Sequence, residues 1–146
     1  MNIKLVNQTQ LKLIADLDNK NNLTPWSYTD YFNSFYQSNQ HIYVLTQSQQ
    51  IYGVIVFSLY KDEMEILQLW IDKHYRQCGY AKMLMQFLLS TGKKKSITAI
   101  YLEVRKSNIS AINLYLSFSF KEIGVRKNYY HTSQITEDAL VMQCIL

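Results

Sequence analysis

Three β-rich runs follow one another between residues 41 and 72, with only short breaks between them. HIYVLTQS (41–48) and IYGVIVFSLY (51–60) are separated by Gln49 and Gln50, and a tight KDEM turn leads into EMEILQLWID (63–72). Strands joined by so few residues pair as antiparallel hairpins, although the first turn lacks the usual glycine or asparagine. We therefore expect a three-stranded antiparallel meander, which restricts the chain to folds built on such a sheet.

The pattern changes after Tyr75. From Tyr80 to about Leu89, apolar residues recur three and four positions apart, which predicts a helix that closes near Gly92. The run TAIYLEVR (98–105) alternates and predicts the next strand. Strand, helix and strand in this order form a crossover unit, which is right-handed in nearly all proteins.

The remaining segments extend this sheet and cover its faces. NIKLV (2–6) alternates as a first strand, while residues 8–20 and 28–36 repeat apolar side chains at helical spacing. The later elements are a helix at 108–118 and two final strands, FKEIGVRK and DALVMQCIL. We predict an α/β fold with a mixed, mostly antiparallel sheet of about six to seven strands flanked by about four helices. At 146 residues, the chain is expected to be a single domain, 1–146.

Composition excludes several classes of protein. The hydrophobic share is 48% and the aromatic share 14%, which argues against disorder. No apolar run approaches the roughly 20 residues that span a bilayer, and MNIKLVNQTQLK lacks a signal-peptide core. We therefore expect a cytoplasmic protein without a membrane partner.

Cys78 and Cys144 form no CxxC, so neither a disulfide framework nor a metal site is indicated. The net charge of +4 suits polyanions such as nucleotide phosphates, but nothing indicates a specific nucleic-acid partner.

The stretch HYRQCGYA (74–81) lies where a predicted strand ends and a predicted helix begins. A helix N-terminus presents unpaired backbone N–H groups and a partial positive charge, so it binds anions. Gly79 and Ala81 leave the backbone accessible, and Arg76 and Lys82 add positive charge. This pattern indicates a pyrophosphate cradle, with an ordinary turn glycine as the alternative. It is neither a Walker loop nor a dinucleotide fingerprint, because the further residues of both motifs are missing.

The same loop carries a family resemblance. RQCGYA (76–81) fits the Q/R-x-x-G-x-G/A signature of the GCN5-related N-acetyltransferase superfamily, and LEVRKSNISAINLYLSFSF (102–120) resembles the segment that follows there. PWS (25–27) and VRKNYYHTSQITEDALVM (125–142) resemble its RimI-type branch. Members of that branch acetylate the N-terminal alanine of a small-subunit ribosomal protein. The resemblance runs from about residue 23 to residue 142.

The resemblance implies acetyl-CoA as the co-substrate and no metal. In this superfamily the strand before the loop splays away from the next strand. Backbone groups of Leu69, Trp70 and Ile71 would then pair with pantetheine, much as a peptide adds to a sheet edge. Asn108 falls on a family cofactor contact. The residues implied for the diphosphate are Arg76, Gln77, Cys78, Gly79, Tyr80, Ala81 and Lys82.

The resemblance also makes Glu103 the general base and Tyr115 the general acid. Each has a plainer alternative. Glu103 shares a face of its predicted strand with Tyr101 and Arg105, so it can be a sheet-face carboxylate beside Arg105. Tyr115 lies on the apolar stripe of its helix, where a tyrosine is usually part of the core. Asn108 can be a helix N-cap, a role compatible with cofactor contact.

The chemistry favours an N-terminal amine as the acceptor. Near pH 7, an α-amino group of pKa about 7.8 is roughly 14% neutral, against about 0.04% for a lysine of pKa about 10.4. We therefore expect acetyl transfer to a protein N-terminus, by resemblance that of a ribosomal protein, through direct attack in a ternary complex. The alternatives are other N-termini, lysines or a small amine, and a non-catalytic acyl-CoA-binding module. A ping-pong route through Cys78 is disfavoured, since a thiol in the phosphate loop would lie far from the thioester.

The chain departs from the branch pattern at a few positions. Ser119 stands where glycine usually forms the left-handed cap after a helix, so that turn is expected to be strained or reshaped. His131 and residues 134–136 replace the usual residues of a loop that borders the peptide site in relatives. Trp26 is expected either to wall the peptide groove or to pack in the core.

Overall fold

A computed structural model describes all residues from Met1 to Leu146. The helices are α1 (Leu11–Asn21), α2 (Tyr28–Phe35), α3 (Tyr80–Lys94) and α4 (Ile109–Ser117), with short 3-10 turns at Gln8–Gln10 and Lys73–Tyr75. The strands are β1 (Asn2–Leu5), β2 (Gln40–Gln47), β3 (Gln50–Tyr60), β4 (Glu63–Ile71), β5 (Ala99–Arg105), β6 (Lys121–His131) and β7 (Thr136–Ile145). All seven strands form one sheet in the order β1-β2-β3-β4-β5-β7-β6, which confirms the predicted mixed α/β architecture.

Strands β1 to β4 form the expected antiparallel meander. The β2–β3 turn lies one residue earlier than predicted, at Ser48 and Gln49, and Gln50 already begins β3. Both turn residues have positive φ angles, 49° and 67°. Two consecutive positive φ angles match the right-handed twist of the paired strands, and here they are adopted without glycine or asparagine.

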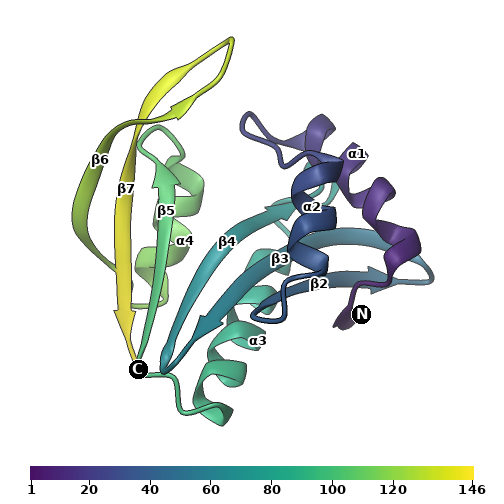
Figure 1. Cartoon of the computed structure of the whole chain (residues 1–146), viewed down its shortest axis with the longest axis horizontal. Coiled ribbons are helices and arrows are strands. Elements are labelled where there is room, and N and C mark those ends of the chain that lie inside the picture. The colour runs from purple at the N-terminus through teal and green to yellow at the C-terminus, as the bar shows by residue number, and fades with distance from the viewer.

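The centre of the sheet opens between β4 and β5. These strands are parallel and joined by α3, as predicted, but they pair only from Glu63 opposite Ala99 to Ile66 opposite Leu102. Beyond this point β5, β7 and β6 diverge from β4, and the sheet divides into two arms (Figure 1). The opening leaves one edge of β4 without a neighbouring strand.

A β-bulge at Leu67 lies at the start of this opening. Val56 of β3 pairs with Gln68 and the next residue, Phe57, pairs with Ile66, so Leu67 has no partner. A bulge shifts the alternation of side chains along a strand. Ile66 therefore packs in the core beneath α3, whereas Gln68 faces α1 and bonds to Asp18. This irregularity was not predicted from the sequence.

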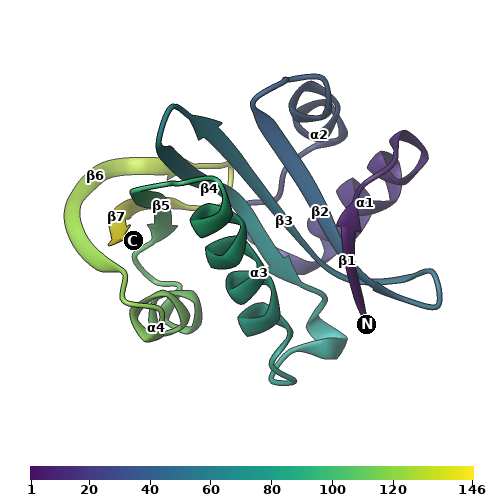
Figure 2. The same ribbon diagram turned by 90° about the horizontal axis from the view of Figure 1, so that it is seen from below.

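Two hydrophobic cores hold together the layers of helices and sheet that Figure 2 shows. Helices α3 and α4 cover one face of the sheet, and α1 and α2 cover the other. Leu84, Met85 and Leu88 give α3 a fully buried stripe at helical spacing. Truncating one such side chain to alanine typically costs about 2–5 kcal/mol. Helix α3 continues past Gly92 to Lys94, two residues beyond the predicted end.

At Gly53 and Ser119 the backbone restricts which residue can be accommodated. A Cβ atom on Gly53 would lie 2.5 Å from Ile71 Cδ1 and 2.7 Å from the Trp70 carbonyl oxygen, so β3 and β4 approach too closely there for a side chain. Ser119 has φ 68°, which confirms the expected left-handed turn after α4. Its N–H donates to the Leu116 carbonyl, and the Phe120 N–H donates to that of Tyr115. These two bonds form a Schellman cap, usually made with glycine.

None of the helices is long and apolar enough to cross a membrane.

Candidate active site

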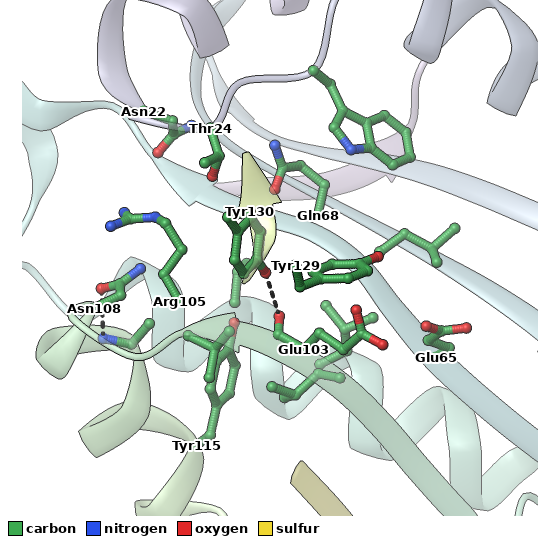
Figure 3. A pocket seen from close by; sticks show the side chains of 17 residues that line it. Asn22, Thr24, Glu65, Gln68, Glu103, Arg105, Asn108, Tyr115, Tyr129 and Tyr130 are labelled. Atoms are coloured by element: carbon green, nitrogen blue, oxygen red, sulfur yellow. Dashed lines mark hydrogen bonds between the residues drawn. The ribbon is translucent and has the colours of Figure 1, made fainter. Parts of the chain in front are cut away.

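The divergence of β4 and β5 creates two adjoining cavities. The α3 groove, of about 570 Å³, is bounded by residues 69–71, the loop before α3 and one side of α4. The β5 cavity, of about 260 Å³, lies on the α1 side of the sheet and includes Glu65, Glu103, Tyr129 and Tyr130 (Figure 3). The residues that line both are Asn22, Leu69, Arg105, Asn108, Ala111 and Tyr115. The two cavities therefore meet in the gap between the strands.

The N-terminus of α3 opens into the α3 groove. Gly79 is the N-cap and has φ 82°, and no side chain caps the first turn. A Cβ atom at Gly79 would meet no atom within 4 Å. The left-handed backbone by itself therefore favours glycine here, and no other atom of the protein crowds the position. The first N–H groups of the helix have no intrahelical partner, so they can bind an anion in the groove.

The loop before α3 is held in place by Arg76. Its Nε donates to the Ile71 carbonyl at 3.1 Å, and a terminal nitrogen donates to the Asn21 carbonyl at 2.8 Å. The Arg76 side chain thus ties the loop to the ends of β4 and α1, a role that was not predicted from the sequence. Lys82 lines the groove and is exposed. Cys78 does not line the groove; its exposed thiol contacts the Arg76 carbonyl at 3.5 Å.

Residues 69–71 present the free edge of β4 to the α3 groove. On their other edge they pair with β3, where Ile71 lies opposite Gly53 and Leu69 opposite Ile55. Their remaining backbone groups face the opening, so an extended ligand can add there as a further strand. The Trp70 side chain points away from the groove into the smaller core, where its Nε1 donates to the Tyr31 hydroxyl at 2.9 Å.

Tyr115 lies at the junction of the two cavities. Its side chain is buried and contacts Phe120, with ring centroids 5.8 Å apart. Burial, and to a smaller extent the nearby Tyr130, raises the Tyr115 pKa, so the hydroxyl keeps its proton at neutral pH. Asn108 directly precedes α4: its Oδ1 accepts from the Ala111 N–H at 3.2 Å, which confirms the predicted N-cap.

Glu103 faces the β5 cavity, as the alternation of β5 predicts. Ile100, Leu102 and Val104 are buried on the opposite face of the strand. The partner of Glu103 is not Arg105, beside which the plainer alternative placed it, but Arg126 of β6, whose Nη1 donates to Oε1 at 2.7 Å. Arg105 instead pairs with Glu137 at 3.6 Å.

Three further residues shape the β5 cavity and were not singled out from the sequence. The Tyr130 hydroxyl donates to the Glu103 carbonyl at 3.2 Å, and burial followed by the Glu103 charge raises the Tyr130 pKa to about 12. The Arg126 guanidinium lies 4.2 Å above the centroid of the Tyr129 ring. Burial, followed by repulsion from Glu103, raises the Glu65 pKa. The tyrosines belong to the NYY motif, but no local signal marked Glu65.

A buried polar network supports the α1–α2 loop beside this cavity. Asp18 is fully buried and its Oδ2 accepts from the Tyr31 hydroxyl at 2.5 Å, the Gln68 side chain at 3.0 Å and the Trp26 N–H at 3.0 Å. Its other oxygen accepts from the Asn22 side chain. The network therefore connects β4 to the loop that places Asn22 and Trp26 at the cavity wall. The α2 aromatic residues do not line the cavity. No three His, Cys, Asp or Glu side chains gather where they could hold a metal ion.

Known proteins are similar to this chain in both sequence and structure. Residues 11–120 match the model of the acetyltransferase (GNAT) family. A ribosomal protein bS18-alanine N-acetyltransferase from Haemophilus influenzae is 32% identical over 146 residues, covering 99% of this chain and 98% of the relative. Its counterpart from Salmonella typhimurium is 28% identical over 141 residues, covering 96% and 94%. The crystal structure of the Escherichia coli ribosomal-protein-S18-alanine N-acetyltransferase superposes with a TM-score of 0.90 at 28% identity, covering 99% of this chain and 92% of that one. The chain belongs to the acetyltransferase (GNAT) family.

Proposed function

We propose that this chain transfers an acetyl group from acetyl-CoA to the N-terminal α-amine, that of alanine, of a small-subunit ribosomal protein. One observation carries the proposal: Tyr115 lines both cavities, whereas Glu103 lines only the β5 cavity. An amine entering from the β5 side and a thioester entering from the α3 groove would meet beside Tyr115. The bS18-alanine acetyltransferases to which the chain is similar over nearly its whole length support the choice of acceptor.

The α3 groove suits coenzyme A. The free amides at residues 80–82 and the exposed Lys82 would hold the diphosphate. The open edge of β4 at Leu69–Ile71 would accept the amide groups of the pantetheine arm. Asn108 at the shared wall would contact the same arm. Arg76 would act mainly by holding the loop, since two of its donors are already used within the protein.

In the β5 cavity, Glu103 would accept the proton that the acceptor ammonium must lose before it can attack, directly or through a water molecule. The amine nitrogen then forms a bond to the acetyl carbon, and the carbon–sulfur bond breaks. A backbone N–H near Ile71 would stabilise the negative charge that develops on the acetyl oxygen. Tyr115 would give its proton to the departing sulfur, a step that its raised pKa permits because the hydroxyl stays protonated.

A panel of peptides tests the proposal. Each peptide carries one internal lysine, and the pair to compare begins with a free alanine or with the same alanine N-formylated. After incubation with labelled acetyl-CoA, mass spectrometry locates the label. We expect acetylation of the free peptide on its α-amine and no label on the blocked one. Equal labelling of the two peptides would assign the activity to lysine side chains, and labelling of neither would exclude a peptide acceptor of this kind.

A further inference from the structure

Glu103, the carboxylate proposed as the base, is already paired with Arg126 of the same chain. Arg126 donates to Glu103 Oε1 at 2.7 Å, and the Glu103 side chain is only 18% exposed. The Arg126 side chain is 55% exposed, so it can move. An acceptor ammonium that enters the β5 cavity must therefore compete with the guanidinium for this oxygen.

A second carboxylate lies within reach of the same guanidinium. Glu65 lines the β5 cavity and pairs across the strands with Tyr101, which places it on the same sheet face as Glu103 and one diagonal step away (Figure 3). Figure 3 shows the Glu65 and Glu103 side chains in the same cavity, and the charge of Arg126 acts on both carboxyl groups. The charges of Glu103 and Arg126 act on Glu65 in opposite directions. In this structure Glu65 makes no ion pair.

The charge balance of the cavity explains why two acidic groups are useful. Glu65 and Glu103 are the only carboxylates that line it; Arg126 is paired with Glu103 alone, and Arg105 is paired with Glu137. The cavity therefore holds one carboxyl group, that of Glu65, without a cation partner before an acceptor binds. When one ammonium enters, two cations, the ammonium and the Arg126 guanidinium, face the two carboxyl groups of Glu65 and Glu103. Each cation then has a carboxylate partner.

Building on the proposed function, we propose that Arg126 is a positioning residue that passes from Glu103 to Glu65 when the acceptor ammonium arrives. Glu103 is then free to take the proton of the ammonium. The Tyr129 ring, 4.2 Å from the guanidinium carbon, supports the guanidinium during the exchange through a cation–π contact. Glu65 thereby sets how easily a charged acceptor reaches the base, without touching the reacting atoms.

A double-mutant cycle tests the exchange. In Glu65→Gln the guanidinium loses its second partner, so kcat/KM for the acceptor peptide should fall roughly tenfold, within the range of coupling between interacting residues. The KM for acetyl-CoA should not change. In an Arg126→Gln background, the same Glu65→Gln change should alter kcat/KM less than about threefold. Glu63→Gln, on the same strand face but outside the cavity, is the matched control and should match wild type.

If Glu65→Gln lowers kcat/KM equally in both backgrounds, Glu65 binds the acceptor itself and the exchange is wrong. Glu65→Asp should restore part of the activity, which a purely steric role would not predict. A crystal structure of Glu103→Gln gives a readout that does not depend on turnover: Arg126 should lie within 4 Å of Glu65. A guanidinium that remains at residue 103 would overturn the proposal, whereas inactivity of the wild type toward alanine peptides would instead refute the proposed function.

Discussion

Glu103 and Tyr115 face the same cavity, but only Tyr115 also borders the groove at the start of α3. Glu103 comes from β5 and Tyr115 from α4, and the divergence of β4 from β5 exposes both (Figure 3). This arrangement separates the place where an amine would lose its proton from the place where a thiolate would gain one.

Glu103→Gln should lower kcat by about 100-fold or more, the usual contribution of a general base. The affinity for acetyl-CoA should stay within twofold of wild type, because Glu103 does not line the α3 groove. Steady-state kinetics and titration calorimetry measure the two quantities. Glu63→Gln is the control, and unchanged turnover in Glu103→Gln would refute the assignment of the base.

Tyr115→Phe should lower kcat by about 100-fold while the protein stays folded, because the ring and its contact with Phe120 remain. The melting temperature should change little, since only the hydroxyl is lost. Tyr43→Phe is a matched control, because Tyr43 stacks on Phe57 away from both cavities. If both variants keep full activity, Tyr115 is a core residue with no part in proton transfer.

Gly79→Ala should weaken coenzyme A binding. At φ 82° an alanine carries a strain of about 1 kcal/mol, and relief of that strain would turn the α3 amides away from the groove. We expect the Kd for coenzyme A to rise about fivefold or more. Gly124→Ala is the control, because it meets open space without a positive φ. Equal affinities in calorimetry would show that the backbone conformation of Gly79 is not needed for the cofactor.

Asp18→Ala should destabilise the fold and raise the KM for the acceptor peptide. It would leave Tyr31, Gln68 and the Trp26 N–H without their buried acceptor, with a loss of about 3 kcal/mol or more in the free energy of unfolding. The acceptor KM should rise because Trp26 and Asn22 would lose their anchor. Urea unfolding and peptide kinetics measure the two effects. A stable variant with an unchanged KM would show that the network has no role at the cavity.

The same carboxylate predicts a pH dependence. Burial raises the Asp18 pKa above its ordinary 3.8, and its hydrogen bonds offset this only in part. The folded chain therefore keeps a proton on Asp18 at pH values where the unfolded chain has lost it, so this residue contributes less stability as pH rises above about 4. Relative to Asp18→Asn, wild type should lose stability in urea unfolding as pH rises above about 4. A constant difference between the two would contradict the raised pKa.

Much of the fold could be predicted because most helices and strands have a clear local sequence pattern. Alternation in residues 98–105 and the apolar stripe of α3 fixed their types, and the short breaks within 41–72 required hairpins. The bulge at Leu67 could not be predicted, since nothing in LQLW departs from a regular strand. The bulge is defined by the pairing of β4 with β3 at the point where β5 diverges, and these strands are brought together only in the folded sheet.

At the candidate site, the positions of Glu103 and Tyr115 could be predicted from the sequence, but the ion-pair partner of Glu103 could not. The strand alternation oriented Glu103 correctly, and the only cation that it placed beside Glu103, as an alternative reading, was Arg105. The true partner comes from β6, whose register shift between Arg126 and Tyr130 has no local signal. Asp18 was overlooked for a related reason: on its helix it occupies a core position, and only its tertiary donors explain a carboxylate there.

A crystal structure with a conjugate of coenzyme A and an alanine-first peptide, joined through an acetyl carbon, tests the central claim most directly. The account predicts the diphosphate on the amides at residues 80–82, the peptide nitrogen facing Glu103 in the β5 cavity, and the sulfur beside the Tyr115 hydroxyl. A conjugate whose peptide lies outside the β5 cavity, or whose sulfur lies away from Tyr115, would contradict it.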